Sequence, residues 1–183
     1  MYSRIEEFFK KRYEGWEGAV QFEGTGPRLR RMIDEMCWSP EKIQEELKKC
    51  FTTFEEGYSR MIVSGPTSVW TLCPHHLLGC HFEVYIGCIP DSRVLGLSKF
   101  SRVAEIVGRR PIMQETYSRE LVEVIWENLK PKGVGVLVYG KHGCMMVRGI
   151  KQNANVVTSE LRGYFLDQAS VKEEFFQIVR GMK

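Results

Sequence analysis

The sequence lacks any apolar run that approaches the roughly 20 residues a membrane-spanning helix needs. Its first residues, MYSRIEEFFKKRYEGWEG, mix both charge signs where a signal peptide would be apolar. It also lacks an excess of one charge sign, since 26 Lys and Arg residues oppose 23 Asp and Glu residues, for a formal net charge of +3. That balance is too small to predict nucleic-acid binding. We therefore expect a cytoplasmic protein that binds neither nucleic acid nor a membrane.

Cysteines are too few for a disulfide framework, with six in 183 residues, so in a reducing compartment they are core thiols or metal ligands. Low-complexity tracts, internal repeats and long Ser/Pro/Gly linkers are also missing. With 43% hydrophobic and 27% charged residues, the composition is that of a soluble globular chain. We expect an N-terminal helical region, residues 1–58, followed by one structural unit, residues 59–183.

Apolar residues recur at helical spacing in the first third of the chain. This spacing predicts helices over residues 2–13 and 28–37. A third helix is expected over residues 40–57, with Ser39 as its N-cap and an apolar stripe that reaches Phe54.

After about residue 60 the pattern becomes that of β-strands, with runs rich in β-branched and aromatic residues. Strands are expected at residues 61–63, 68–72, 81–89, 93–97, 133–140 and 144–150. Two helices separate the first four strands from the last two, which are expected to pair with each other. A capping box at Ser170 predicts the start of a final helix. This order indicates an α+β fold with helices on one face of an antiparallel sheet.

The sharpest chemical motif is C-P-H-H, which begins at Cys73, because a nearby thiolate and imidazole can bind one Zn²⁺. Cys144 is a third candidate, and in the expected strand it shares a face with His142. With Cys73, His76 and Cys144 as ligands, one tetrahedral position stays open for water. His75 and His142 then remain for proton transfer. Ordinary buried Cys and His residues give the same pattern, whereas the H-x-E and P-C-x-x-C signatures of zinc nucleobase deaminases are absent.

Basic residues form a second set of candidates, since Arg and Lys side chains bind polyphosphates. They are Arg28, Arg30, Arg31, Lys99, Arg102, Arg109, Arg110 and Arg148. A solvated charged surface gives the same pattern. Because no glycine-rich phosphate loop is present, side chains would have to hold the phosphates.

Gln114-Glu115 is a third candidate, placed between the two central helices. A carboxylate can accept two parallel hydrogen bonds from the N1–H and exocyclic amine of guanine. A Glu at the start of a helix is also a common partner of the helix dipole.

Five motifs in this order resemble the GTP cyclohydrolase I family. CPHH resembles the family's C-E-H-H, GLSKFSR its G-L-S-K-x-x-R, and RRPIMQE its R-R-x-Q-x-Q-E. HGCMMVRG resembles H-x-C-M-x-x-R-G, and TGPRLRRM resembles T-P-x-R-x-x-R-M. The resemblance is continuous over residues 72–150 and looser to residue 176.

The resemblance implies the tunnelling fold, a toroidal homodecamer with sites at subunit interfaces, and conversion of GTP to 7,8-dihydroneopterin triphosphate with release of formate. The implied zinc ligands are Cys73, His76 and Cys144. The implied acid–base groups are His75 and His142, the latter protonating N7 as a cation, with Ser98 assisting a ribose rearrangement. The implied purine contacts are Gln114 and Glu115. The implied triphosphate or ribose contacts are Lys99, Arg102, Arg148, Arg28 and Arg31.

The chain departs from the family pattern at Pro74, where the family has Glu, and at Ile112, which replaces the first Gln of R-R-x-Q-x-Q-E. Two alternatives therefore stay open. One is a tunnelling-fold nitrile reductase with a cysteine nucleophile and no zinc, against which the Cys73, His76 and Cys144 set argues. The other is a zinc-stabilised nucleotide-binding ring in which Pro74 marks lost activity. The pathway that consumes the product stays open as well.

Overall fold

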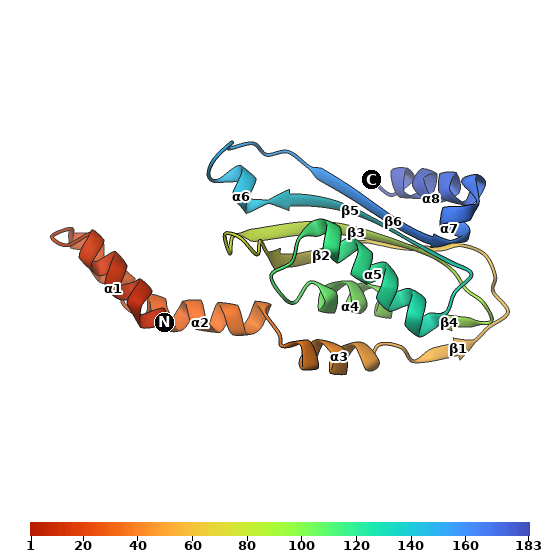
Figure 1. Cartoon of the computed structure of the whole chain (residues 1–183), viewed down its shortest axis with the longest axis horizontal. Helices are drawn as coiled ribbons and strands as arrows, with labels where there is room; N and C mark the ends of the chain where they lie inside the picture. Colours follow the sequence, from red (N-terminus) through yellow and green to blue (C-terminus); the bar gives the residue numbers. More distant parts are fainter. The chain divides into compact units, whose positions relative to one another are not determined.

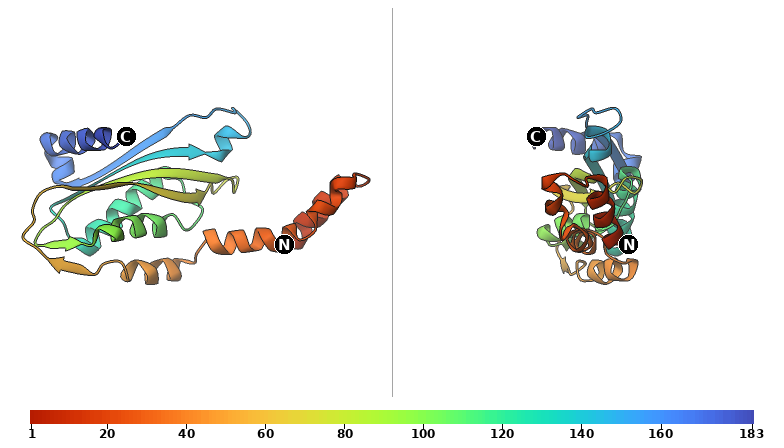
Figure 2. Two further views of the ribbon diagram at one scale, coloured as in Figure 1. Left: turned by 180° about the vertical axis from the view of Figure 1, so that it is seen from behind. Right: turned by 90° about the vertical axis from the view of Figure 1, so that its left-hand side faces the viewer.

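The computed structural model describes residues 1–183, which divide into two compact units, residues 1–38 and 39–183 (Figures 1 and 2). The division comes before residue 58 because helix α3 (Pro40–Lys48) packs on helix α4 (Leu97–Val107) of the larger unit. No helix has both the length and the apolar character needed to cross a membrane.

The smaller unit is helical, as its apolar spacing predicts. Its elements are α1 (Tyr2–Arg12), the 3₁₀ helix η1 (Glu17–Phe22) and α2 (Thr25–Met36). Phe9 stacks on Phe22 with ring centroids 5.4 Å apart, which ties α1 to η1. The Gly26 amide donates a 3.1 Å hydrogen bond to the Glu6 carboxylate, and this bond holds the pKa of Glu6 below its usual value.

The larger unit is built on a four-stranded antiparallel sheet in the order β2-β3-β5-β6. The strands are β2 (Ile62–Leu72), β3 (Gly79–Ile89), β5 (Gly133–His142) and β6 (Val156–Gly163). Helices α4 and α5 (Gln114–Leu129) connect the two strand pairs and cover one face of the sheet (Figure 1). This order confirms the α+β class and the strand pair, helix pair, strand pair arrangement of the tunnelling fold.

The second face of the sheet is covered too, which corrects the expectation of helices on one face only. Helices α7 (Tyr164–Asp167) and α8 (Ala169–Gly181) lie there, and Phe165 and Phe175 form a buried cluster with Tyr85 of β3. On the first face Phe82 packs against Tyr117 of α5, with ring centroids 5.2 Å apart. Burying each such aromatic side chain stabilises the fold by about 1.5–3 kcal/mol. The sheet is therefore held between two apolar layers.

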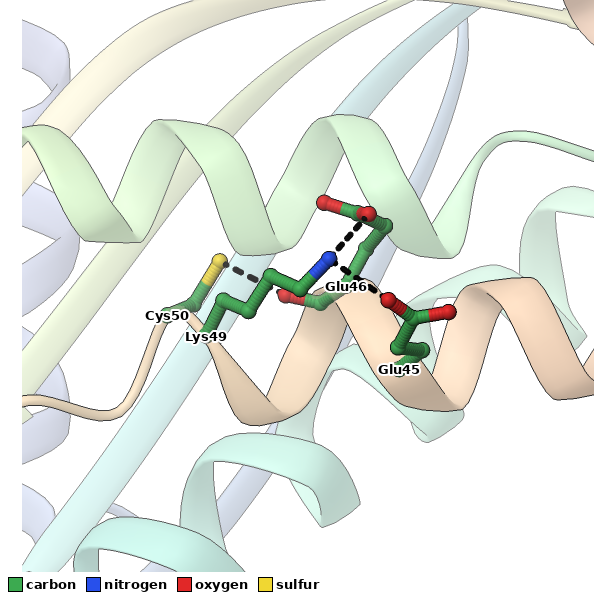
Figure 3. Close-up of polar contacts among 4 residues, drawn as sticks. All are labelled: Glu45, Glu46, Lys49 and Cys50. Carbon is green, nitrogen blue, oxygen red and sulfur yellow. Dashed lines mark hydrogen bonds and ion pairs between the residues drawn. The ribbon is translucent and has the colours of Figure 1, made fainter.

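The expected helix over residues 40–57 is wrong in its second half. Ser39 is the N-cap, as expected, and its Oγ accepts from the Lys42 amide, but α3 ends at Lys48. Lys49 bonds to both Glu45 and Glu46 across the last turn, and the Cys50 thiol donates to the Glu46 carbonyl (Figure 3).

Phe54 instead lies in a short strand, β1 (Thr53–Glu55), which pairs with β4 (Arg93–Leu95). A two-stranded ribbon between segments far apart in sequence thus replaces the end of the expected helix. Strand pairing between distant segments supplies backbone hydrogen bonds that local apolar spacing does not indicate.

Three further expectations about elements are corrected. Residues 61–63 and 68–72 belong to one strand, β2, with a register shift between Ser64 and Thr67. The strand expected at 144–150 is instead the short helix α6 (Gly143–Met146) and a loop, and β5 pairs with β6. The final helix begins at Ala169 without a side-chain cap, so the capping box at Ser170 does not form.

Candidate active site

The donor atoms of Cys73, His76 and Cys144 lie within 4.8 Å of one another. Cys73 and His76 belong to the tight turn between β2 and β3. Two 2.9 Å backbone bonds close this turn, from the Cys73 amide to the Leu78 carbonyl and from the Leu77 amide to the Cys73 carbonyl. Cys144 belongs to α6, which directly follows β5 in the sequence. The fold thus brings all three expected metal ligands together.

Gly143 explains how α6 reaches the turn. A Cβ atom at this position would lie 2.7 Å from the Gly79 carbonyl oxygen, so only glycine permits this approach. His142 ends β5, whereas Cys144 belongs to α6. The expectation that the two residues share a strand face is therefore wrong, although Cys144 still meets Cys73.

The donor set fits a zinc ion. Tetrahedral zinc with Zn–S bonds of about 2.3 Å places two sulfurs about 3.8 Å apart, within the spread of the three donor atoms. Cys73 Sγ already lies 3.5 Å from His76 Nδ1. Burial, together with the neighbouring Cys73, raises the pKa of the Cys144 thiol. A bound dication would reverse this effect by stabilising the thiolate. Because the His76 side is exposed, a fourth position can be reached from solvent.

His142 lies beside this cluster because of the strand register. It pairs with Cys80 across β3 and β5, and its Nδ1 is 3.5 Å from Cys80 Sγ. Its Nε2 is 2.7 Å from Gln114 Oε1. Burial lowers the pKa of His142, while the charge of Glu115 acts in the opposite direction. Burial therefore favours the neutral imidazole in the free protein, and the cation that protonates N7 in the reaction stays a prediction.

Cys80 is a residue of this site that none of the sequence motifs includes. Burial, followed by the charges of Cys73 and Cys144, raises its pKa to about 11, so it keeps its proton at neutral pH. The signal that could have found it is its position as the second residue of the strand that follows the C-P-H-H turn.

Gln114 is the first residue of α5 and is 2% exposed. Its Nε2 donates to the carbonyls of Val138 at 3.1 Å and Val156 at 3.0 Å, and to Thr158 Oγ1 at 3.1 Å. Both ends of its amide thus have protein partners within the chain. Its contact with a purine stays a prediction, as does that of the exposed Glu115 beside it.

The segment before α5 is fastened to the end of β2, which fixes where Gln114 enters the site. The Ile112 amide donates a 3.1 Å hydrogen bond to the Leu72 carbonyl. The buried Thr71 hydroxyl donates to the Arg110 carbonyl at 2.6 Å. Arg110 also pairs with Glu120 of α5.

Arg148 and His75 lie next to the candidate metal ligands, and their expected roles in binding phosphate and moving protons stay predictions. Arg148 Nη1 is 2.6 Å from His76 Nε2, and His75 Nδ1 is 3.9 Å from Cys73 Sγ. Both side chains belong to exposed residues. The cluster therefore has a guanidinium and a second imidazole on its open side.

Ser98, Lys99 and Arg102 are not brought to the cluster within one chain. Ser101, one turn beyond Ser98 on α4, has its hydroxyl 2.9 Å from that of Thr67. At about 3.3 Å per residue, β2 spans roughly 20 Å from Thr67 to Cys73. Lys99 donates to the carbonyl of Lys49 instead, at 3.2 Å.

The two remaining basic candidates lie on α2 of the smaller unit. Arg28 Nη1 donates to the Glu23 carbonyl at 3.0 Å, and Arg31 is exposed. The contact of either residue with a phosphate stays a prediction.

Known proteins resemble this chain in sequence over most of its length. A family model described as GTP cyclohydrolase I matches residues 14–180. GTP cyclohydrolase 1 of Dictyostelium discoideum is 40% identical over 131 residues, which cover 71% of this chain and 56% of that protein. GTP cyclohydrolase 1 of Aquifex aeolicus is 36% identical over 159 residues, covering 86% of this chain and 84% of that protein.

Two solved structures also align with part of the chain. The archaeosine synthase QueF-Like in the apo form aligns with a TM-score of 0.48 at 21% identity, covering 59% of this chain and 97% of that one. E. coli dihydroneopterin aldolase in complex with neopterin aligns with a TM-score of 0.45 at 16% identity, covering 57% and 99%. It is the sequence match, continuous over residues 14–180, that decides the family: this chain belongs to the GTP cyclohydrolase I family.

Proposed function

We propose that this chain is a zinc-dependent GTP cyclohydrolase I. It opens the imidazole ring of GTP by hydrolysis at C8, releases formate and rearranges the remainder to 7,8-dihydroneopterin triphosphate. Membership of the family supports a hydrolase that takes GTP. The observation that carries the proposal is the Cys73, His76 and Cys144 donor set with His142 beside it. This set also disfavours a nitrile reductase that uses a cysteine nucleophile and no metal.

Cys73, His76 and Cys144 would hold the Zn²⁺ ion. When bound, the ion supplies Lewis acidity that makes water nucleophilic near neutral pH. Cys73 is buried and is fixed by backbone bonds in its turn, whereas His76 is exposed. The protein therefore anchors one side of the site and leaves the other open to substrate and water.

His142 acts as the general base and then as the general acid. Because burial favours its neutral form, it can take a proton from the attacking water and give that proton to the purine nitrogen that leaves C8. His75, exposed at the same turn, would move protons in the later ribose steps. Glu115 would accept hydrogen bonds from the guanine edge.

The triphosphate needs positive charge around the open side of the cluster. Arg148 supplies it from the same chain, since its guanidinium already lies at His76. Ser98, Lys99 and Arg102 would come from a neighbouring subunit, because within one chain they lie far from Cys73. This separation supports a ring, expected to be a homodecamer, whose sites are completed between subunits.

The proposal is tested by incubating zinc-loaded protein with GTP and measuring formate and, after oxidation, fluorescent pterin. We expect equal amounts of both products. Formate without pterin would mean that the reaction stops at the opened pyrimidine, and the absence of both would favour a non-catalytic ring.

Two variants test the site itself, with a matched control. Cys144→Ala is expected to lose both zinc and turnover, whereas Cys37→Ala, a thiol of the smaller unit, is expected to retain them. Glu115→Ala is expected to raise the KM for GTP while zinc content stays the same. Retained GTP turnover in Cys144→Ala and Glu115→Ala would contradict the site assignment.

A further inference from the structure

We propose that Gln114 is a positioning residue that holds the His142 ring through its Nε2–H group, with Nδ1 facing the Cys80 thiol. This inference rests on the proposed acid–base function of His142. It differs from the purine contact expected for Gln114, because it gives the side chain a role inside the protein rather than at the substrate.

The orientation of the Gln114 amide follows from its three partners at one end. The carbonyl oxygens of Val138 and Val156 can only accept hydrogen bonds, so the group that faces them at 3.1 and 3.0 Å must be the amino group. The reverse orientation would place a carbonyl oxygen against two other carbonyl oxygens. Gln114 Oε1 therefore faces His142.

The proton on His142 follows from the same reasoning. Oε1 is an acceptor, and it lies 2.7 Å from His142 Nε2, so this nitrogen carries the hydrogen. In a neutral imidazole only one nitrogen is protonated, so Nδ1 keeps its lone pair. Its neighbour is the thiol of Cys80 at 3.5 Å, a weak donor that a stronger partner can replace.

The surroundings of Gln114 hold the amide rigidly. Thr158 Oγ1 accepts a bond from the amide and lies 2.7 Å from the buried Ser118 hydroxyl. That hydroxyl donates to the backbone carbonyl of Gln114 at 3.0 Å. Gly140 forms the floor beneath it, since a Cβ atom there would overlap Gln114 Oε1. Such a buried and fully bonded glutamine has a single orientation available.

Nδ1 lies on the side of His142 that faces Cys80, its partner in the strand register. Cys80 is the second residue of the strand that follows the C-P-H-H turn. In the proposed function, the lone pair of Nδ1 accepts the proton of the attacking water. A base with the opposite tautomer would present an N–H group instead and could not accept a proton.

The tautomer can be measured directly in the intact protein by NMR of samples labelled with ¹⁵N-histidine. The His142 signals are identified by their loss in His142→Asn. We expect wild-type His142 at neutral pH as the Nε2–H tautomer. An Nδ1–H tautomer would overturn the proposal without any activity measurement, so this result is distinguishable from failure of the proposed function.

Gln114→Leu separates positioning from substrate contact. We expect kcat for GTP to fall about 100-fold, KM to change less than about threefold, and the His142 spectrum to show mixed tautomers. Thr158→Val removes one bond from the amide but keeps Oε1 on His142, so kcat and the His142 spectrum are expected to change less than in Gln114→Leu. A raised KM with unchanged kcat in Gln114→Leu would instead assign Gln114 to the purine.

Discussion

Gly140→Ala is a small change at the point where strand β5 passes beneath the Gln114 amide. The new Cβ would overlap Gln114 Oε1 and would lie 3.0 Å from His142 Nε2. Ordinary contact between carbon and oxygen is about 3.5 Å, so the amide has to move by more than about 1 Å. Its bonds to Val138 and Val156, at 3.1 and 3.0 Å, cannot survive that displacement unchanged.

The cost can be worked from two contributions. Forcing a methyl group into a packed site costs about 1–3 kcal/mol. A buried amide that loses a hydrogen-bond partner costs about 1–3 kcal/mol more. Since partial relaxation reduces both, we expect Gly140→Ala to lower the free energy of unfolding by about 2–4 kcal/mol. Because the amide also orients His142, kcat for GTP should fall in the same variant.

Urea unfolding followed by far-UV circular dichroism measures this change. Gly57→Ala is the matched control, since Gly57 has nothing within 4 Å of the added Cβ. We expect this control to remain within about 0.5 kcal/mol of the wild type. If Gly140→Ala is as stable and as active as Gly57→Ala, Gly140 is not needed to hold the Gln114 amide in place.

Three other predictions concern parts of the chain away from the reaction. Phe175→Ala should lower the free energy of unfolding by about 3–5 kcal/mol in urea titrations, because the ring is fully buried against Phe165. Cys88, whose pKa burial raises to about 12, should resist iodoacetamide at pH 8 in the folded protein and react once it is unfolded, as mass spectrometry can show. The Glu6 carboxyl should titrate below 4.5 by NMR, because the Gly26 amide favours its ionised form. The stability that this bond contributes should be present above pH 4.5 and be lost as the pH falls through the lowered pKa of Glu6.

Much of the candidate site could be predicted from the sequence because its motifs are short. Cys73 and His76 lie in one turn, so their closeness needs no long-range information. The chemistry of Cys144 makes it a candidate ligand, but the strand expected there is wrong, since α6 forms instead. The three donor atoms still lie close together, and their role as metal ligands stays a prediction.

Strand β6 was not predicted, because its residues lack the clear apolar alternation that is typical of a strand. Its burial alternates weakly, and polar residues such as Thr158 and Glu160 occupy it. A strand at the edge of a sheet needs little apolar signal, because pairing with β5 supplies its backbone bonds. The expected helix to residue 57 failed for a related reason, since residues 53–55 pair with β4.

The sequence by itself determined the α+β class, the central helices, the local C-P-H-H turn and, through ordered motifs, the family. Those features depend on periodicity and on residues close along the chain, where local sterics and side-chain chemistry decide the outcome. Only the tertiary structure decided that Gln114 bonds to His142, that Cys80 lies opposite His142, and that Ser98 is remote from Cys73. These relations depend on strand register and on how α5 packs over the sheet. Both are fixed by contacts between distant segments, because backbone and buried polar groups must find hydrogen-bond partners there.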